Sequence, residues 1–322
     1  MKPSIFVTRA LPDAGLKRLQ EHFEVTVNPE DRVLTKNEVI QGLQKKDALL
    51  CLLTDTIDKD VMDASPNLKI ISNYAVGFNN IDIKEATRRK IPVCITPGIL
   101  TEATADLTFA LILSVVRKIV EADQYLRAGH FTGWAPNLFL GGDLTGKTLG
   151  IIGMGRIGEA VAKRAKGFDM KVVYYSRTPK NLPGMDYLPL DTLLKTADVI
   201  SLHTPLTSET HHLIGATQFK MMKNSAYLIN TTRGPVVDEK ALIQALQSNE
   251  IAGAGLDVFE EEPELMPGLV ELTNTVLLPH IGSATVETRS KMAVLAAENA
   301  IAIIQGQKPH AIANAAVLEI HK

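Results

Sequence analysis

Cysteine is scarce in this chain, and so are clusters of like charge. Among 322 residues only Cys51 and Cys94 are cysteines, and both lie in apolar runs, so we interpret them as buried, reduced thiols. Two such residues exclude a disulfide framework and fit a reducing compartment. The formal net charge is -2 and no dense run of lysine or arginine occurs, which argues against nucleic acid as a partner.

Long apolar segments are also missing. The first ten residues hold a short apolar patch that Arg9 interrupts, which is too short for a signal peptide. The longest apolar helical run, Leu107–Val116, stops at Arg117 and falls far short of a membrane span. The sequence therefore predicts a cytoplasmic protein without a membrane partner.

The pattern that is present is an alternation of apolar strand-like runs with helical ones. Apolar residues make up 45% and charged residues 22%, which is ordinary for a globular protein, and the length favours two domains. The first strands are expected at Ser4–Thr8, Glu24–Val27, Ala48–Leu53, Lys69–Asn73 and Pro92–Ile95. The helices between them are expected at Leu16–His22, Lys36–Leu43, Lys59–Ala64 and Ile83–Arg88. Such alternation predicts a parallel sheet covered on both faces.

A second series follows a long helical stretch. One helix is expected over Thr101–Gly129, and the loop after it, His130–Gly146, contains the only tryptophan, Trp134. Further strands are expected at Thr148–Ile152, Lys171–Tyr175, Val199–Leu202, Ala226–Asn230, Ala254–Val258 and Thr275–Leu278. A last helix, Thr285–Gln305, leaves a short tail that we expect to return to the first domain.

These patterns predict an α/β fold with two doubly wound domains. A flavodoxin-like substrate domain is expected to comprise residues 1–100 and 287–322, and is therefore discontinuous. A Rossmann dinucleotide-binding domain is expected to comprise residues 101–286.

The strongest local motif is a Gly-x-Gly-x-x-Gly turn between an apolar strand and a helical pattern. Gly153 permits the tight turn, Gly155 lets the backbone approach a pyrophosphate, and Gly158 lets helix and strand pack closely. Arg156 and Ile157 lie within this turn and are expected to contact the cofactor. The helical pattern that follows, Glu159–Gly167, would present free N–H groups and a dipole that favour phosphate. This context predicts dinucleotide binding.

The residues after the second strand of this domain indicate which dinucleotide is bound. Ser176 stands where an acid is expected in an NAD site, Arg177 can pair with a 2′-phosphate, and Thr178 can donate a hydrogen bond. We therefore expect NADP(H) to be preferred, with NAD(H) possible. The alternative is that Arg177 is simply solvated.

Three candidate catalytic residues follow three other predicted strands, where ligands of open α/β sheets bind. They are Arg233, Glu262 and His280. Taken singly, the arginine could be a capping or ion-pair residue, the acid part of a solvated loop, and the histidine uninvolved in catalysis. Together they offer an arginine to bind a carboxylate, a histidine to donate a proton and an acid to orient that histidine. Reduction of a carbonyl beside a carboxylate requires these three groups.

With these motifs the chain resembles the D-isomer-specific 2-hydroxyacid dehydrogenases over essentially its whole length. The matching segments are Asn73–Asp82, Gly153–Gly158, His203–Thr207, Asn230–Val237, Gly253–Pro263 and Pro279–Ser283. Within the family, Trp134-Ala135-Pro136 and the Ser176–Thr178 segment are most similar to the glyoxylate/hydroxypyruvate reductases. The resemblance implies reduction of a small 2-keto acid to the D-2-hydroxy acid by a nicotinamide cofactor.

The resemblance also implies roles for individual residues. Arg233 would hold the carboxylate and keto oxygen of the substrate, His280 would donate the proton, and Glu262 would hold His280. The other cofactor contacts would come from Thr104, His203, Thr204, Pro205, Thr231, Thr232 and Asp257. The other substrate contacts would come from Leu53, Ala75, Val76, Gly77 and Ser283. Trp134 would reach the site of a partner subunit in a homodimer. No metal site is expected.

One departure from the family and three alternative functions remain at this point. The family loop commonly carries an acid where this chain has Asn79 after Phe78. The alternatives within the class are 2-ketogluconate reduction and other D-2-hydroxyacid oxidations or reductions. The alternative of another class is a nucleotide-sensing scaffold like the corepressors of this family, because fold alone does not decide function.

Overall fold

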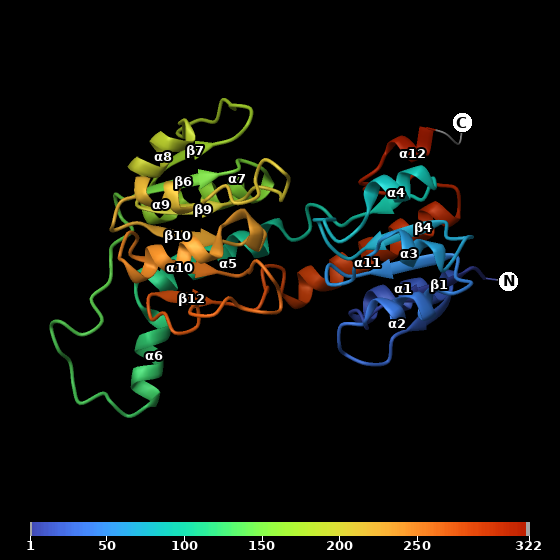
Figure 1. The fold of residues 1–322 in the computed structure, drawn as a ribbon, viewed down its shortest axis with the longest axis horizontal. Coiled ribbons are helices and arrows are strands. Elements are labelled where there is room, and N and C mark those ends of the chain that lie inside the picture. Colours follow the sequence, from blue (N-terminus) through green and yellow to red (C-terminus); the bar gives the residue numbers. More distant parts are fainter. Residues whose placement is uncertain (1, 320–322) are drawn as a thin grey trace. The chain divides into compact units, whose positions relative to one another are not determined.

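The computed structural model describes residues 2–319, which divide into two compact units (Figure 1). Unit 1 comprises the residues up to Leu100 and those from Ala284 onward, and unit 2 comprises Thr101–Ser283. The chain therefore re-enters unit 1 before residue 287, where the second boundary was expected. The reason is local: the Thr285 side chain caps helix α11 (Val286–Ile304) by accepting a hydrogen bond from Thr288 N, and α11 packs on α1 of unit 1. Residues 1 and 320–322 of the expected first domain lie outside the described residues.

Unit 1 is built on a five-stranded parallel sheet in the order β2-β1-β3-β4-β5, the flavodoxin-like order. Its strands are β1 (Ser4–Val7), β2 (Glu24–Val27), β3 (Ala48–Cys51), β4 (Ile70–Asn73) and β5 (Val93–Cys94). Its other helices are α1 (Asp13–His22), α2 (Lys36–Leu43), α3 (Lys59–Asp63), α4 (Ile83–Arg88) and α12 (Ala316–Glu319). Apolar clusters on both faces of the sheet bury α1 and α11 on one side and α2 to α4 on the other. All five predicted strands and the doubly wound architecture are confirmed.

The C-terminal tail adds to this sheet. Ile312 forms an antiparallel bridge with Cys94, and the Asn314 side chain accepts a hydrogen bond from Val93 N at 2.8 Å while donating to Ile91 O at 2.9 Å. The last described residues therefore satisfy backbone groups at the β5 edge.

Unit 2 is built on a seven-stranded parallel sheet in the order β12-β11-β10-β9-β6-β7-β8. Its strands are β6 (Thr148–Ile152), β7 (Lys171–Tyr175), β8 (Asp186–Tyr187), β9 (Val199–Leu202), β10 (Tyr227–Asn230), β11 (Gly253–Leu256) and β12 (Thr275–Leu277). Its helices are α5 (Thr101–Val116), α6 (Ile119–Arg127), α7 (Arg156–Ala165), α8 (Leu190–Thr196), α9 (Ala216–Met221) and α10 (Glu239–Gln247). Six of these strands were predicted. The seventh, β8, was missed because it consists of two exposed residues and has no apolar run.

The single long helix expected over Thr101–Gly129 is wrong. The chain breaks after α5, where Lys118 adopts a left-handed conformation with φ of 53°. The carbonyl of Val116 instead accepts a hydrogen bond from Gly142 N at 3.0 Å, so the returning loop satisfies the end of α5. Although α5 is strongly apolar, the described residues include no helix with both the length and the apolar character to cross a bilayer.

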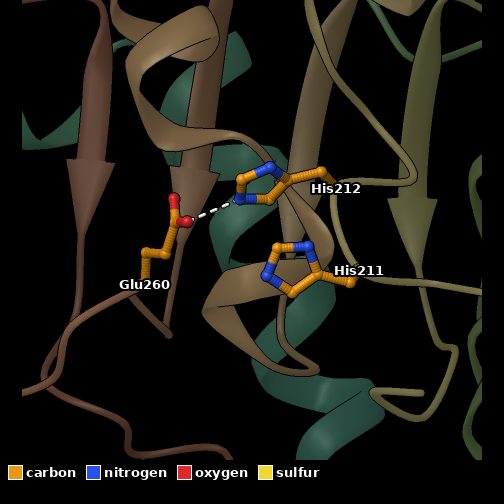
Figure 2. A group of neighbouring side chains, drawn as sticks. All are labelled: His211, His212 and Glu260. Carbon is orange, nitrogen blue, oxygen red and sulfur yellow. Dashed lines mark hydrogen bonds and ion pairs between the residues drawn. The ribbon is translucent and has the colours of Figure 1, made fainter. Parts of the chain in front are cut away.

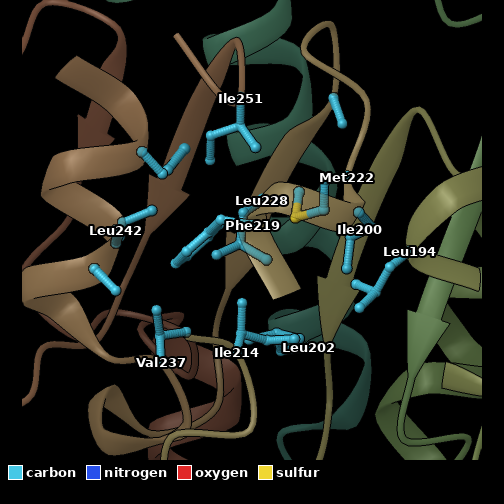
Figure 3. Close-up of a cluster of buried hydrophobic side chains, with 14 of the residues drawn as sticks. Leu194, Ile200, Leu202, Ile214, Phe219, Met222, Leu228, Val237, Leu242 and Ile251 are labelled. Carbon is cyan, nitrogen blue, oxygen red and sulfur yellow. The ribbon is translucent and has the colours of Figure 1, made fainter. Parts of the chain in front are cut away.

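A buried apolar layer holds the strands of unit 2 in place. Figure 3 shows part of it, with Phe219 and Leu242 from the helices meeting Leu228 and Ile200 from the sheet. A second layer, contributed by α5 and α7, covers the opposite face. Burying each large side chain is worth about 1.5–3 kcal/mol, so these layers fix the strand ends from which the candidate site residues extend.

Candidate active site

The carboxyl ends of the parallel strands in unit 2 carry the predicted cofactor and catalytic residues. The chain runs from β6 outward to β8 on one side and from β9 outward to β12 on the other, so the order reverses between β6 and β9. Ligands of open α/β sheets bind outside the strand ends at such a reversal. The glycine turn follows β6, Ser176–Thr178 follow β7 and His203–Pro205 follow β9, while Arg233, Glu262 and His280 follow β10, β11 and β12.

Two glycines of the turn are needed because other backbone atoms lie too close for a side chain to fit. Gly153 has a φ of +100°, and a Cβ there would lie 2.5 Å from the carbonyl oxygen of His203. A Cβ at Gly158 would lie 2.4 Å from the carbonyl oxygen of Gly153. Gly155, which precedes the first turn of α7, differs: no atom among the described residues lies within 4 Å of its Cβ position. The turn is therefore packed behind Gly153 and Gly158 and open at Gly155.

Beside this turn lie two polar atoms whose hydrogen-bonding capacity is not used. His203 Nε2 is 2.8 Å from Ser201 Oγ, and burial lowers the pKa of His203 to about 3, so its imidazole is neutral. Within residues 2–319, neither His203 Nδ1 nor Thr204 Oγ1 has a hydrogen-bond partner. Buried polar atoms are rarely left unsatisfied, so this position suits a polar ligand.

The end of β7 holds Ser176 in place and leaves Arg177 exposed. Ser176 Oγ donates to Thr178 O at 2.7 Å. The pKa of Glu209 is lowered, first by a hydrogen bond from Thr207 and additionally by the positive charge of Arg177. Glu209 is thus an acid near the expected 2′-phosphate site that was missed. It lies in an irregular turn, and no sequence spacing relates it to Arg177.

The three candidate catalytic residues come together in unit 2. His280 Nδ1 lies 2.7 Å from Glu262 Oε2, and Glu262 Oε1 accepts a hydrogen bond from Phe259 N at 3.0 Å. His280 has a φ of +53°, and its backbone N–H donates to Leu278 O at 3.0 Å. A left-handed histidine is an unusual conformation, and such residues cluster at functional sites.

The charges in this group influence one another. Burial raises the pKa of Glu262, but the hydrogen bond and charge of His280, together with Phe259 N–H and Arg233, outweigh it, so the pKa of this carboxyl is lowered. Burial lowers the pKa of Arg233, and the negative charge of Glu262 partly offsets that effect. Arg233 Nη1 donates to Thr232 O at 2.7 Å. The result is an ionised carboxylate between a histidine and a partly buried guanidinium.

Four further predicted contacts have structural partners of their own. Asp257 accepts hydrogen bonds from Ile281 N and Gly282 N, both at 2.7 Å, and Thr104 Oγ1 donates to Gly282 O at 3.1 Å. These two residues fix the turn that follows His280. Thr231 Oγ1 is hydrogen-bonded to Thr108 Oγ1. Thr232 donates two hydrogen bonds, from its N–H and from Oγ1, to Asn230 Oδ1.

The expected substrate residues of unit 1 lie on loops after β3 and β4. Leu53 is exposed, and the loop of Ala75, Val76 and Gly77 is held by two hydrogen bonds. Asn73 Nδ2 donates to Gly77 O at 2.9 Å, and Ala75 O accepts from the backbone of a neighbouring loop. The loop backbone is therefore fixed by its own unit.

The chain also matches known proteins. Residues 109–282 match the family described as D-isomer specific 2-hydroxyacid dehydrogenase, NAD binding domain. The chain belongs to the D-isomer-specific 2-hydroxyacid dehydrogenases. A glyoxylate reductase from Thermococcus litoralis is 52% identical over 326 residues, covering 99% of this chain and 98% of the relative. One from Korarchaeum cryptofilum is 50% identical over 328 residues, with the same two shares.

A solved structure extends the likeness to three dimensions. The NADPH-dependent glyoxylate/hydroxypyruvate reductase from Sinorhizobium meliloti, in complex with NADP and malonate, matches with a TM-score of 0.86 and 33% identity. The match covers 99% of this chain and 98% of that one. The predicted family and fold class are confirmed, and this dehydrogenase is an oxidoreductase that uses a nicotinamide dinucleotide.

The glycine turn of this dehydrogenase fits such a cofactor. The open position at Gly155, the first turn of α7 and the unsatisfied atoms of His203 and Thr204 lie together at the strand ends. When a dinucleotide is bound, the helix N-terminus and backbone N–H groups of the turn would hold its pyrophosphate.

We predict that Gly155→Ala weakens dinucleotide binding about tenfold or more without destabilising the protein, because its Cβ meets nothing in the protein but would occupy the path of the pyrophosphate. Its φ of -90° suits alanine, so the free energy of unfolding should stay unchanged or rise by up to about 1 kcal/mol. NADPH affinity by fluorescence titration and chemical denaturation measure the two quantities. Gly158→Ala is the control that should lose stability. A Gly155→Ala variant that binds NADPH as tightly as the parent would contradict the assignment.

Proposed function

We propose that this dehydrogenase reduces glyoxylate or hydroxypyruvate, with NADPH as the preferred cofactor, to glycolate or D-glycerate. The observation that carries the proposal is the His280–Glu262 pair beside the partly buried Arg233, at the sheet edge that also bears the glycine turn. Support also comes from relatives named glyoxylate reductase and glyoxylate/hydroxypyruvate reductase. We place the reaction in the cytoplasm, in keeping with the composition.

Arg233 binds and polarises the substrate. Its guanidinium is poorly hydrated, so its attraction for the carboxylate and keto oxygen of a 2-keto acid is stronger than in water. Negative charge grows on the keto oxygen during reduction, and a positioned donor of this kind is worth about 3–4 kcal/mol. A bound reduced nicotinamide would supply the hydride.

His280 donates the proton to the keto oxygen. Its Nδ1 is engaged by Glu262, which leaves Nε2 to face the substrate. Glu262 is ionised, so it accepts a hydrogen bond from Nδ1 and holds the ring with Nε2 available to pass a proton to the substrate. This orientation depends on the hydrogen bond from Phe259 N to the second oxygen of Glu262.

The remaining contacts follow the family pattern residue by residue. The backbone N–H groups of Ala75, Val76 and Gly77 bind the substrate carboxylate, with Leu53 and Ser283 beside it. Asp257 and Thr104 hold the nicotinamide end of the cofactor, both directly and through the turn after His280. The cofactor contacts along its length are completed by Arg156, Ile157, His203, Thr204, Pro205, Thr231 and Thr232.

The preference for NADPH rests on the end of β7. Ser176 carries no charge to repel a 2′-phosphate, and Arg177 is exposed and can pair with one. Glu209 acts in the opposite direction, because its carboxylate lies close enough to Arg177 to interact with it. Discrimination between the cofactors therefore depends on the balance of these two charges.

A homodimer is proposed from helix α6 and the segment that follows. No residue of α6 is buried, and apolar residues along α6 and the segment are exposed. They are Ile119, Val120, Leu126, Phe131, Trp134, Leu138 and Leu140, and Trp134 is 85% exposed. So many exposed apolar side chains within one segment indicate a protein interface, and we assign it to a second copy whose site Trp134 reaches.

The central prediction concerns turnover. Arg233→Ala and His280→Ala should each lower kcat/KM for glyoxylate by about a hundredfold or more, because Arg233 holds the substrate and stabilises the charge developing on its keto oxygen, and His280 supplies the proton. NADPH binding should be retained. The measurement is NADPH oxidation with glyoxylate, hydroxypyruvate and 2-ketogluconate, with His310→Ala as the control for loss of an exposed histidine. Near-parental turnover in Arg233→Ala or His280→Ala would remove that residue from the mechanism, and a clear preference for 2-ketogluconate would replace the substrate.

A second prediction separates the cofactors. Arg177→Ala should weaken NADPH binding about tenfold or more while leaving NADH nearly unchanged, since a charge-assisted hydrogen bond is worth about 1.5–3 kcal/mol. Glu209→Gln should shift the ratio of the two affinities the other way, towards NADPH. Dissociation constants for both cofactors measure this. Equal losses for NADPH and NADH in Arg177→Ala would contradict the 2′-phosphate assignment.

A third prediction concerns assembly. Leu126→Glu places a charge on the exposed face of α6 and should convert a dimer to a monomer in sedimentation experiments at micromolar concentration. Val270→Glu, at an equally exposed apolar position of unit 2 outside this segment, is the matched control and should leave the dimer intact. A parental protein that sediments as a monomer would overturn the proposal.

A further inference from the structure

A cluster of metal-binding side chains lies outside the proposed reductase site. His211 and His212 follow β9, and Glu260 follows β11, and each residue offers one donor atom within 4.8 Å of the other two. Figure 2 shows that both imidazole rings present a nitrogen towards the side on which Glu260 lies. No proposed step of the reduction uses these three residues, and the sequence gives no sign that they meet.

The donor atoms are close to the separation that a metal ion imposes. His212 Nε2 lies 2.5 Å from Glu260 Oε1, and the two imidazole rings are 4.1 Å apart with planes inclined by 31°. In a tetrahedral zinc site with bonds of about 2.0–2.1 Å, neighbouring donors lie about 3.3 Å apart. The His212–Glu260 pair is closer than this value and the other donor pairs lie within 4.8 Å, so small rotations of the side chains are sufficient to reach it.

The carboxylate is held in place by a second acid. Glu260 Oε2 accepts a hydrogen bond from Glu239 N at 3.1 Å, and Glu260 N donates to Glu239 Oε2 at 3.3 Å. This leaves Glu260 Oε1 on the histidine side. An outer contact that fixes a ligand in this way is a common feature of protein metal sites.

The surroundings also favour a cation. Glu239 is only 4% exposed, and its Oε1 has no hydrogen-bond partner anywhere in residues 2–319. Glu239 and Glu260 thus place two carboxyl groups side by side, and a dication beside Glu260 would offset their negative charge.

We propose that His211, His212 and Glu260 bind a late first-row transition-metal dication, of which Zn²⁺ is the representative. Two imidazole nitrogens and one carboxylate oxygen are the donor types that Zn²⁺ accepts, whereas Mg²⁺ and Ca²⁺ select oxygen ligands. Three protein ligands leave the fourth position to water. The bound ion joins the turn after His203–Pro205 to the loop that contains Glu262, so it restrains two loops of the proposed site without taking part in the reaction.

The test measures zinc bound by the whole protein, prepared without an affinity tag and freed of metal by chelation. Competition with a chromophoric zinc chelator should give one Zn²⁺ per chain, and Co²⁺ should give the visible absorption of a tetrahedral complex. His211→Ala and Glu260→Gln should each weaken zinc binding about tenfold or more, because each removes one of three ligands. Zn²⁺ should raise the melting temperature of the parent but not that of His211→Ala, since an ion that binds only the folded state stabilises it.

Two control variants make the result specific. His22→Ala removes an imidazole whose Nε2 lies 3.9 Å from the carboxylate of Glu21, and His280→Ala removes the imidazole paired with Glu262. Both should retain the ion, and Mg²⁺ should not displace it. Absence of zinc binding by the parent, or unchanged affinity in His211→Ala, overturns the proposal. Loss of the ion in His280→Ala also overturns it, because the ion would then belong to the reductase site. None of these readouts depends on reductase activity.

Discussion

The parallel register of the seven-stranded sheet is the constraint on which the chemistry of this dehydrogenase depends. β10, β11 and β12 run side by side, with Leu228 paired to Ala254 and Ala254 to Thr275, so the chain leaves all three strands at one edge. Arg233, Glu262 and His280 are far apart in sequence and share that edge for this reason alone. The buried layers on both faces of the sheet hold the strands in place, and the backbone hydrogen bonds between the strands keep them parallel and in register.

Within this frame, Glu262 connects the other two charged groups. It accepts hydrogen bonds from His280 and from the backbone of Phe259, and it lies close enough to Arg233 for each to alter the pKa of the other. A carboxylate held between an imidazole and a guanidinium remains ionised despite partial burial. Asp257 extends the arrangement by fixing the turn after His280 through two backbone N–H groups. Backbone N–H groups thus hold both Glu262 and Asp257 in place.

The strand pattern and the glycine turn could be predicted because both are local. Apolar runs such as Ile70–Asn73 and Thr148–Ile152 have the length and composition of buried strands, and the spacing of Gly153, Gly155 and Gly158 has a direct steric meaning. Two features were not predicted, because the local sequence pattern does not indicate them. β8 is two exposed residues, and the helix break at Lys118 occurs where neither glycine nor proline interrupts the helical pattern.

What the sequence alone determined is the order and type of most of the elements, the glycine turn after β6, and the family. Periodicity and the steric demands of glycine act over a few residues, so they can be read without knowing where the chain goes next. The tertiary structure alone decided which distant side chains meet, as with His211 and His212 beside Glu260. These proximities arise from strand order and from the paths of irregular turns, and no short-range pattern of residues encodes either.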